Sequence, residues 1–399
     1  MNTTASASMS RIRAIDITRA LTMVLMIFVN DLWSLHNIPS WLEHVERGVD
    51  GIGLADTVFP AFLFIVGLSL PFALQHRRKK GQTQWSLAQH IILRSLALII
   101  MGVFLVNGES LDMAAMGISR NLWYILSITG FILIWNQYPA QWPYGSKAVL
   151  RITGGVLLCV LAILYRGGGE GGTIEYFQPH WWGILGLIGW AYLASGLVTL
   201  IARERIAWIC GAWVFFALLS MAYHAHWVPS FLSFIPATIL GGTETGLTMG
   251  GVLTALVFQH YHQQGSSVRM TLILLGFTVL LTVLSILTRP YWGLAKLGAT
   301  PAWLFLCSAF TIWLFLAVYW IAEVYQKSDW FKVVLPAGTD TLLTYFIPYY
   351  AYALMYFSGW HLPGFLLEGS VGLVKSLLFA LLCAWVAKIL SRSGIKLKL

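Results

Sequence analysis

Residues 11–31, RIRAIDITRALTMVLMIFVND, and residues 44–71, HVERGVDGIGLADTVFPAFLFIVGLSLP, decide what kind of protein this chain forms. Each segment contains an apolar run of the length that crosses a bilayer, yet each also carries polar side chains. A charged group at the bilayer centre costs about 2.5–3.5 kcal/mol even on the most lenient insertion scale, so such groups normally face a bundle interior or a wet cavity. The polar side chains in question are Asp16, Arg19, Asn30, Asp31 and Asp56.

The composition of the whole chain is that of a membrane protein. Its 399 residues are 58% hydrophobic and 10% charged, and its mean hydropathy is +0.73, whereas a soluble domain averages about 25% charged residues. The net charge of +9 would suit a nucleic-acid partner, but the basic residues lie in short loops between apolar runs, where they set orientation. The sequence therefore predicts an integral membrane protein that does not bind nucleic acid.

Apolar runs of spanning length predict an all-α bundle of about 10–12 transmembrane helices. We place twelve of them, near residues 14–36, 57–75, 88–107, 120–136, 148–165, 181–201, 206–223, 244–262, 270–288, 302–325, 339–357 and 371–391. Only a short basic turn separates the sixth run from the seventh, which predicts a tight hairpin. No soluble segment is long enough to stand apart, so residues 1–399 are expected to form a single domain. The four cysteines all fall inside these runs without metal-ligand spacing, which predicts buried apolar residues and no metal site.

The distribution of Lys and Arg predicts the orientation of the bundle. If the N-terminus is cytoplasmic, sixteen of them, from Arg11 and Arg13 to Lys396 and Lys398, fall in cytoplasmic loops and five fall in the opposite loops. The positive-inside rule then places both termini in the cytoplasm. Acidic residues and histidines show the reverse bias. They indicate either solvated loops or an extracytoplasmic pocket for a cationic or hydroxyl-rich substrate.

Two groups of charged residues lie toward the cytoplasmic end of the spans. Asp16 and Arg19 are three positions apart, at i and i+3, so they can pair on one helix face. Arg94 lies early in the third span and is a second buried-charge candidate. Either these residues hold helices together, or they bind an anionic ligand where a nucleotide-bearing donor would enter.

Three further residues lie toward the other end. Asn30 suits a hydrogen bond between helices, and Asp56 suits an N-terminal cap of the second span. His44 has the side chain that most often transfers protons near neutral pH, with Glu43 or Glu46 close enough to orient its ring. An inert loop histidine is the alternative.

These segments resemble motifs of the heparan-α-glucosaminide N-acetyltransferase family. Residues 11–31 resemble its first core helix, R-L-x-S-x-D-x-F-R-G running to F-V-N or L-V-N, and DGIGLADTVFPAFLFIVGLSLPFAL (50–74) resembles W-N-G-x-x-x-A-D-L-V-F-P-x-F-L-F-I-x-G. RPYWGLAKLGATPAW (289–303) and LPAGTDTLLTYFIPYYAY (335–352) are similar to its late motifs. We therefore expect a bacterial relative of the family, with core motifs in residues 11–72 and late motifs in residues 289–357.

The resemblance carries expectations about activity and partners. Members of the family are polytopic enzymes that move an acetyl group from cytoplasmic acetyl-CoA to an amino sugar on the far side of the membrane. It implies acetyl-CoA as co-substrate, no metal, an amino sugar or glycan as acceptor, membrane lipid around the bundle and a multi-pass protein of the inner membrane. A homodimer is one assembly that it implies. A transporter or flippase for a glycan or lipid-linked sugar is the alternative function, and a non-catalytic scaffold is a third.

The resemblance also assigns residues. The asparagine that ends the family's first core helix corresponds to Asn30, and its loop histidine corresponds to His44, with His36 as the second candidate. Two additional residues follow His44, and Asp50 stands where the family has asparagine. Our hypothesis is that His44 acts as general base and that the Asn30 amide holds the oxyanion. The residues expected to bind substrate or donor are Asp16, Arg19, Asp31, Asp56, Arg94, Arg120 and Lys296.

Overall fold

The structure is a computed structural model that describes residues 12–399, so Arg11 of the topology count lies outside the described residues. The fold is all-α. Its long helices are α1 (Arg13–Asp31), α2 (Leu54–Lys79), α3 (Gln84–Glu109), α5 (Arg120–Trp135), α6 (Tyr144–Leu164), α7 (Ile184–Ile201), α8 (Ile206–His224), α10 (Thr243–Gln263), α11 (Ser267–Trp292), α12 (Pro301–Tyr319), α14 (Thr341–Ser358) and α15 (Gly369–Arg392). The shorter elements are α4 (Met113–Met116), α9 (Ala237–Leu240), α13 (Leu335–Thr339), and the strands β1 (Gly167–Gly168) and β2 (Ile174–Glu175).

Each of the twelve predicted runs coincides with one long helix. Eight helices in the described part of the chain are long and apolar enough to cross a membrane by length and composition, and α5 is apolar but shorter. The remaining three, α1, α10 and α14, carry more polar residues along their length. The prediction of an all-α, polytopic membrane bundle is thus confirmed.

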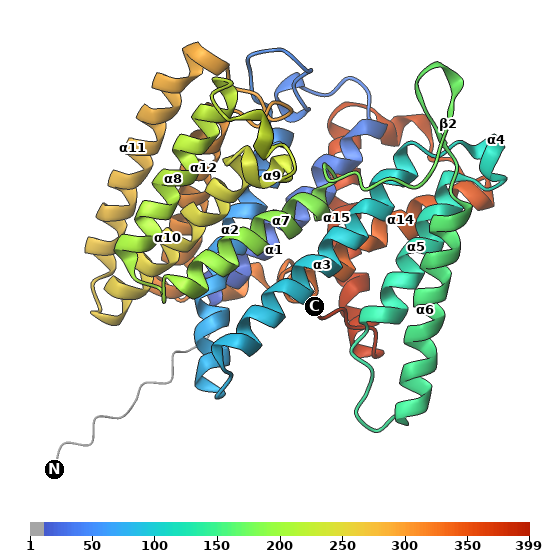
Figure 1. The fold of residues 1–399 in the computed structure, drawn as a ribbon, viewed down its shortest axis with the longest axis horizontal. Helices are drawn as coiled ribbons and strands as arrows, with labels where there is room; N and C mark the ends of the chain where they lie inside the picture. Colours follow the sequence, from blue (N-terminus) through green and yellow to red (C-terminus); the bar gives the residue numbers. More distant parts are fainter. Residues whose placement is uncertain (1–11) are drawn as a thin grey trace.

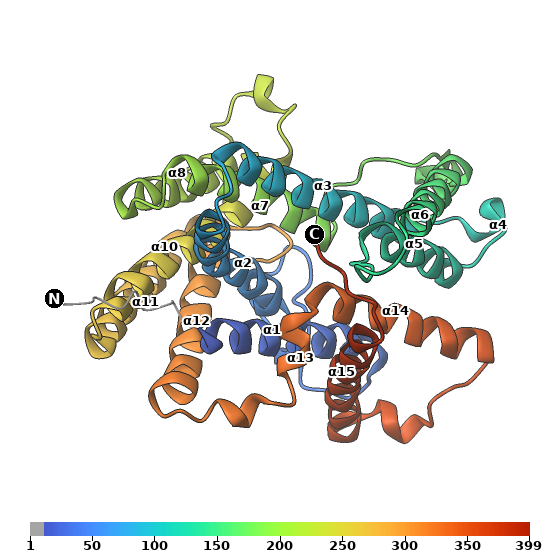
Figure 2. The same ribbon diagram turned by 90° about the horizontal axis from the view of Figure 1, so that it is seen from below.

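The helices divide into a buried centre and an exposed periphery. The apolar windows of α2 and α3 are 61% and 72% buried inside the protein, whereas those of α8, α11 and α15 are 28% buried and that of α6 is 17% buried. Figures 1 and 2 show α8 and α11 at one end of the long axis and α5 and α6 at the other, with α1 and α2 between them. The peripheral helices therefore present their apolar faces to lipid.

Two details of the sequence prediction are wrong. Cys307 and Cys383 are buried as expected, but Cys159 and Cys210 are exposed, because they lie on the peripheral helices α6 and α8. The expected hairpin of α7 and α8 is not packed along its length. Instead, α7 lies mainly against α3, and α8 lies mainly against α10.

The interface of α2 and α10 depends on glycines that let the two backbones approach each other. A Cβ on Gly67 would overlap the carbonyl oxygen of Thr248, and one on Gly251 would overlap that of Phe64. Small residues at such positions are the usual basis of close helix packing in membranes. This contact fixes the position of α2, which carries Asp56 in its first turn.

Gly67→Ala is expected to destabilise the protein, because the added methyl group has no space between the two backbones. Overpacking of this kind typically costs about 1–3 kcal/mol, which should appear as a lower thermal unfolding midpoint of the detergent-purified protein. The matched control is Gly276→Ala on α11, where an added Cβ meets no atom within 4 Å. Equal midpoints for the two variants would contradict the close packing of α2 on α10.

Candidate functional site

Asp56 joins the start of α2 to the loop that carries His44. Its Oδ2 accepts hydrogen bonds from the backbone N–H of Gly53 and of Val45, both at 3.1 Å. The cap position itself is occupied by Gly53, and Asp56, the third residue of α2, stabilises the helix start by accepting from that residue. Its Oδ1 lies 2.7 Å from Nδ1 of His44. Because a carboxylate only accepts, Nδ1 of a neutral His44 ring carries the proton and Nε2 keeps its lone pair. Asp56 is 2% exposed and His44 is 47% exposed, so this lone pair is accessible.

Lys296 lies beside the same imidazole ring. Its Nζ is 3.3 Å from Nδ1 and 3.5 Å from Nε2 of His44. Burial lowers the pKa of the Lys296 amine from its ordinary value, while the nearby Asp56 carboxylate acts in the opposite direction. The loop between α11 and α12 thus contributes a cation to the pair formed by His44 and Asp56.

A second contact holds these two loops together. Arg289 donates through Nε to both carboxylate oxygens of Asp50, at 3.0 and 3.1 Å, and the backbone N–H of Leu294 donates to Oδ1 at 2.7 Å. The hydrogen bond from Leu294, together with Arg289, lowers the pKa of Asp50. The backbone N–H of Gly51 also donates to the carbonyl of Leu294, at 2.9 Å. Figure 1 shows both loops at the same end of the bundle.

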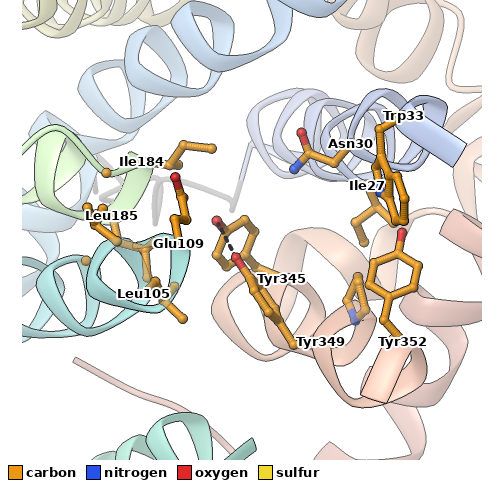
Figure 3. A pocket seen from close by; sticks show the side chains of 14 residues that line it. Ile27, Asn30, Trp33, Leu105, Glu109, Ile184, Leu185, Tyr345, Tyr349 and Tyr352 are labelled. Carbon is orange, nitrogen blue, oxygen red and sulfur yellow. Dashed lines mark hydrogen bonds between the residues drawn. The ribbon is translucent and has the colours of Figure 1, made fainter. Parts of the chain in front are cut away.

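Asn30 lines a cavity of about 490 Å³ between α1, α3, α7 and α14. Figure 3 shows its amide directed into this space. No residue within the described range 12–399 hydrogen-bonds to the amide, so the predicted role of Asn30 as a link between helices has no support. His44 is not among the residues that line the cavity. The lining residues are Ile27, Asn30, Trp33, Gly102, Leu105, Val106, Glu109, Gly183, Ile184, Leu185, Tyr345, Pro348, Tyr349 and Tyr352.

Asp31, the neighbour of Asn30, is fully engaged in contacts between helices. Its carboxylate accepts hydrogen bonds from Tyr352 at 2.7 Å, from Lys375 at 2.7 Å and from Ser376 at 2.6 Å. These donors lie on α14 and α15. Asp31 therefore links α1 to α14 and α15.

The predicted pairing of Asp16 with Arg19 is present at the other end of α1. Arg19 Nη1 lies 3.2 Å from Asp16 Oδ1, and Nη2 donates to Ser69 of α2 at 2.6 Å. Arg19 also reaches the carbonyl of Gly338 in α13, at 3.4 Å. This cluster connects three helices, and it lies far along α1 from Asn30.

The other two arginines singled out in the sequence have different surroundings. The guanidinium carbon of Arg94 lies 5.0 Å from the centre of the Tyr192 ring. Its Nε is buried and has no hydrogen-bond partner among the described residues. Arg120 donates through Nη2 to the backbone carbonyl of Glu109, at 2.9 Å. Arg120 is thus close to the cavity, and Arg94 is not among its lining residues.

Sequence reasoning missed most of the polar lining of the cavity. Tyr345, Tyr349 and Tyr352 come from one face of α14, and Glu109 is the last residue of α3. The spacing of the tyrosines, at i, i+4 and i+7, is the signal that predicts a shared helix face. For Glu109 the only signal was its membership of the acidic surplus in the loops opposite the basic ones.

Comparison with known proteins gives one family and two curated relatives. Residues 7–240 match the model of a family described as Domain of unknown function (DUF5009). Heparan-alpha-glucosaminide N-acetyltransferase of Mus musculus is 35% identical over 108 residues, which cover 26% of this chain and 15% of the mouse protein. The protein of the same name from Homo sapiens is 33% identical over 106 residues, with 26% and 15% covered. The matched segment thus spans only a small part of these relatives, and it confirms the resemblance found in the motifs.

Proposed function

We propose that this chain, which belongs to the family of the domain of unknown function DUF5009, is a membrane-embedded acetyltransferase. It would transfer an acetyl group from cytoplasmic acetyl-CoA to an amino sugar or glycan at the extracytoplasmic face of the inner membrane. The observation that carries this proposal is the hydrogen bond between His44 and Asp56, which puts the proton of a neutral ring on Nδ1 and the lone pair on Nε2, 3.5 Å from Nζ of Lys296. The partial identity to two N-acetyltransferases supports the class of reaction.

In this proposal the acceptor attacks the thioester carbonyl of acetyl-CoA. His44 takes a proton from the attacking amine or hydroxyl through Nε2, and Asp56 holds the ring in the required tautomer. The carbonyl oxygen becomes an oxyanion in the tetrahedral intermediate, and the Asn30 amide donates a hydrogen bond to it. Collapse of the intermediate breaks the carbon–sulfur bond and releases the coenzyme A thiolate.

The donor is proposed to enter from the opposite end of the bundle. Asp16, Arg19 and Arg94 would shape this entry, and Nε of Arg94, which has no hydrogen-bond partner among the described residues, would bind an anionic group there. The basic residues 77–80 at the end of α2 would attract the phosphates of coenzyme A. A donor that enters at one end and an acceptor that binds at the other require no movement of the acceptor across the membrane.

Acetyl-CoA is expected to stabilise the purified protein and to release free coenzyme A thiol when glucosamine is present. A ligand at one hundred times its Kd stabilises the folded state by about 2.7 kcal/mol, which a thermal-shift measurement in detergent detects. Adenosine at the same concentration serves as the control that lacks both the phosphates and the thioester.

Absence of stabilisation by any acyl-CoA would reject the donor. Flux of a glycan across protein-containing liposomes without acyl-CoA would instead favour a transporter, in which the same polar residues line a path.

A further inference from the structure

Among the described residues that line the cavity between α1, α3, α7 and α14, Glu109 alone carries a carboxylate. Figure 3 shows this carboxylate and the hydroxyls of Tyr345 and Tyr349 turned toward the same space, with the Asn30 amide across from them. The two phenol oxygens are 3.4 Å apart, and Glu109 is close enough to both tyrosines to interact with them electrostatically. The polar groups of the cavity therefore converge.

No described residue forms a hydrogen bond or ion pair with the Glu109 carboxylate. The nearby cation is Arg120, but its hydrogen bond goes to the backbone carbonyl of Glu109. The rest of the lining is largely apolar, with Ile27, Leu105 and Ile184 among its members. The Glu109 side chain is exposed toward this space, so its carboxylate is accessible to a ligand. A ligand that brings a positive charge would form a charge-assisted hydrogen bond with it.

We propose that Glu109 binds the acceptor as a protonated primary amine and accepts the first of its two protons. This inference rests on the proposed acetyltransferase function and narrows it to transfer onto nitrogen. An ammonium group offers three N–H donors, which suit one carboxylate and two phenol oxygens. The aromatic faces of Tyr345, Tyr349 and Trp33 add a favourable environment for a cation and for the apolar face of a sugar ring.

The proton balance explains why two bases are needed. An ammonium nitrogen has no lone pair, and it must lose two protons to become the nitrogen of an amide. The first proton passes to the Glu109 carboxylate, which leaves a neutral amine and a neutral carboxyl group. The amine attacks the thioester carbonyl, and the coenzyme A thiolate leaves. The second proton of the nitrogen passes to His44, the base of the proposed mechanism. Because His44 does not line the cavity, this step requires the reacting nitrogen to lie between the cavity and the loop that carries His44. A hydroxyl acceptor loses only one proton and gives Glu109 no charge partner.

The test compares Glu109→Gln with a matched control, Asp112→Asn. Asp112 is also an acidic residue near the end of α3, but it caps the short helix α4 and is not part of the cavity lining. With acetyl-CoA as donor, E109Q is expected to raise the KM for glucosamine about tenfold or more, because a charge-assisted hydrogen bond is lost. Its activity should recover as the pH rises, since free amine then forms in solution, whereas D112N should behave like the wild type.

A binding measurement separates this inference from the proposed function. Without any donor, glucosamine should raise the thermal midpoint of the wild type and of D112N, but not that of E109Q. N-acetylglucosamine, which has no positive charge, should stabilise none of them. Glu109→Asp keeps the charge and should retain part of the effect even if E109Q does not fold.

Each outcome is decisive. Equal KM values and equal stabilisation for E109Q and D112N, or stabilisation of the wild type by both sugars alike, would overturn the role of Glu109 while leaving the acetyltransferase in place. Stabilisation that follows the predicted pattern in a protein that transfers no acetyl group would support the amine site and reject the proposed function.

Discussion

Replacing His44 with alanine is expected to lower the rate of acetyl transfer by about 10²–10⁴-fold, the usual contribution of a general base. The fold should survive, because the His44 side chain is half exposed. Among the described residues, its ring nitrogens contact only Asp56 and Lys296. Asp56 keeps both of its backbone donors in the variant, so its contact with the start of α2 remains. The measurements are the initial rate of coenzyme A thiol release and the thermal midpoint.

His36→Ala is the informative control for this prediction. His36 is an exposed histidine in the same connection between α1 and α2, and its backbone pairs with residues 367 and 369. It should keep the wild-type rate. Added imidazole should restore part of the activity of the His44 variant, which a merely structural defect would not allow. Loss of activity in His36→Ala alone would move the role of base to His36, and full activity in both variants would refute the mechanism.

Replacing Asn30 is expected to slow the chemical step by about 10²–10³-fold, the usual cost of removing one oxyanion donor. The Asn30 amide has no partner among residues 12–399, so its N–H groups are available to a ligand in the cavity. Asn30→Asp is the sharpest substitution, because it preserves the shape but replaces the donor with a negative charge. Single-turnover rates should fall, while the affinity for acetyl-CoA in thermal-shift titrations changes little.

The control for the charge alone is Asn121→Asp. Asn121 lies in the first turn of α5 and does not line the cavity. Its variant should transfer acetyl groups at the wild-type rate. If Asn30→Asp instead weakens donor binding and leaves the single-turnover rate unchanged, Asn30 is a binding residue and the oxyanion needs another donor.

The elements of the fold were predictable because their signal is local. An apolar run of spanning length forms a helix in a membrane whatever its neighbours are, and the twelve runs match twelve helices. Which helices become neighbours depends on surfaces that meet only in three dimensions. Gly102 and Gly186 let α3 and α7 approach closely, so α7 packs there and not along α8.

The same distinction applies to the site. The ion pair of Asp16 and Arg19 follows from their spacing on one helix. The contact of His44 with Asp56 crosses an irregular loop, and Lys296 reaches it from a segment 252 residues away. Glu109 meets the tyrosines of α14 only because α3 and α14 border one cavity. No periodicity in the sequence contains that information.

The hydrogen bonds that Asp31 accepts from α14 and α15 help to fix the direction in which Asn30 points. Successive residues of an α-helix differ by about 100° around its axis, so Asn30 and Asp31 face different neighbours. A rotation of α1 that turned Asn30 out of the cavity would therefore also move Asp31 away from its partners. The hydrogen bonds from Lys375 and Ser376 to Asp31 oppose that rotation. Both donors lie beyond residue 240, where the family match ends. The C-terminal helix α15 thus helps to set the rotation of α1 about its own axis. A fragment restricted to residues 7–240 would retain α1 but would lack the contacts that orient Asn30.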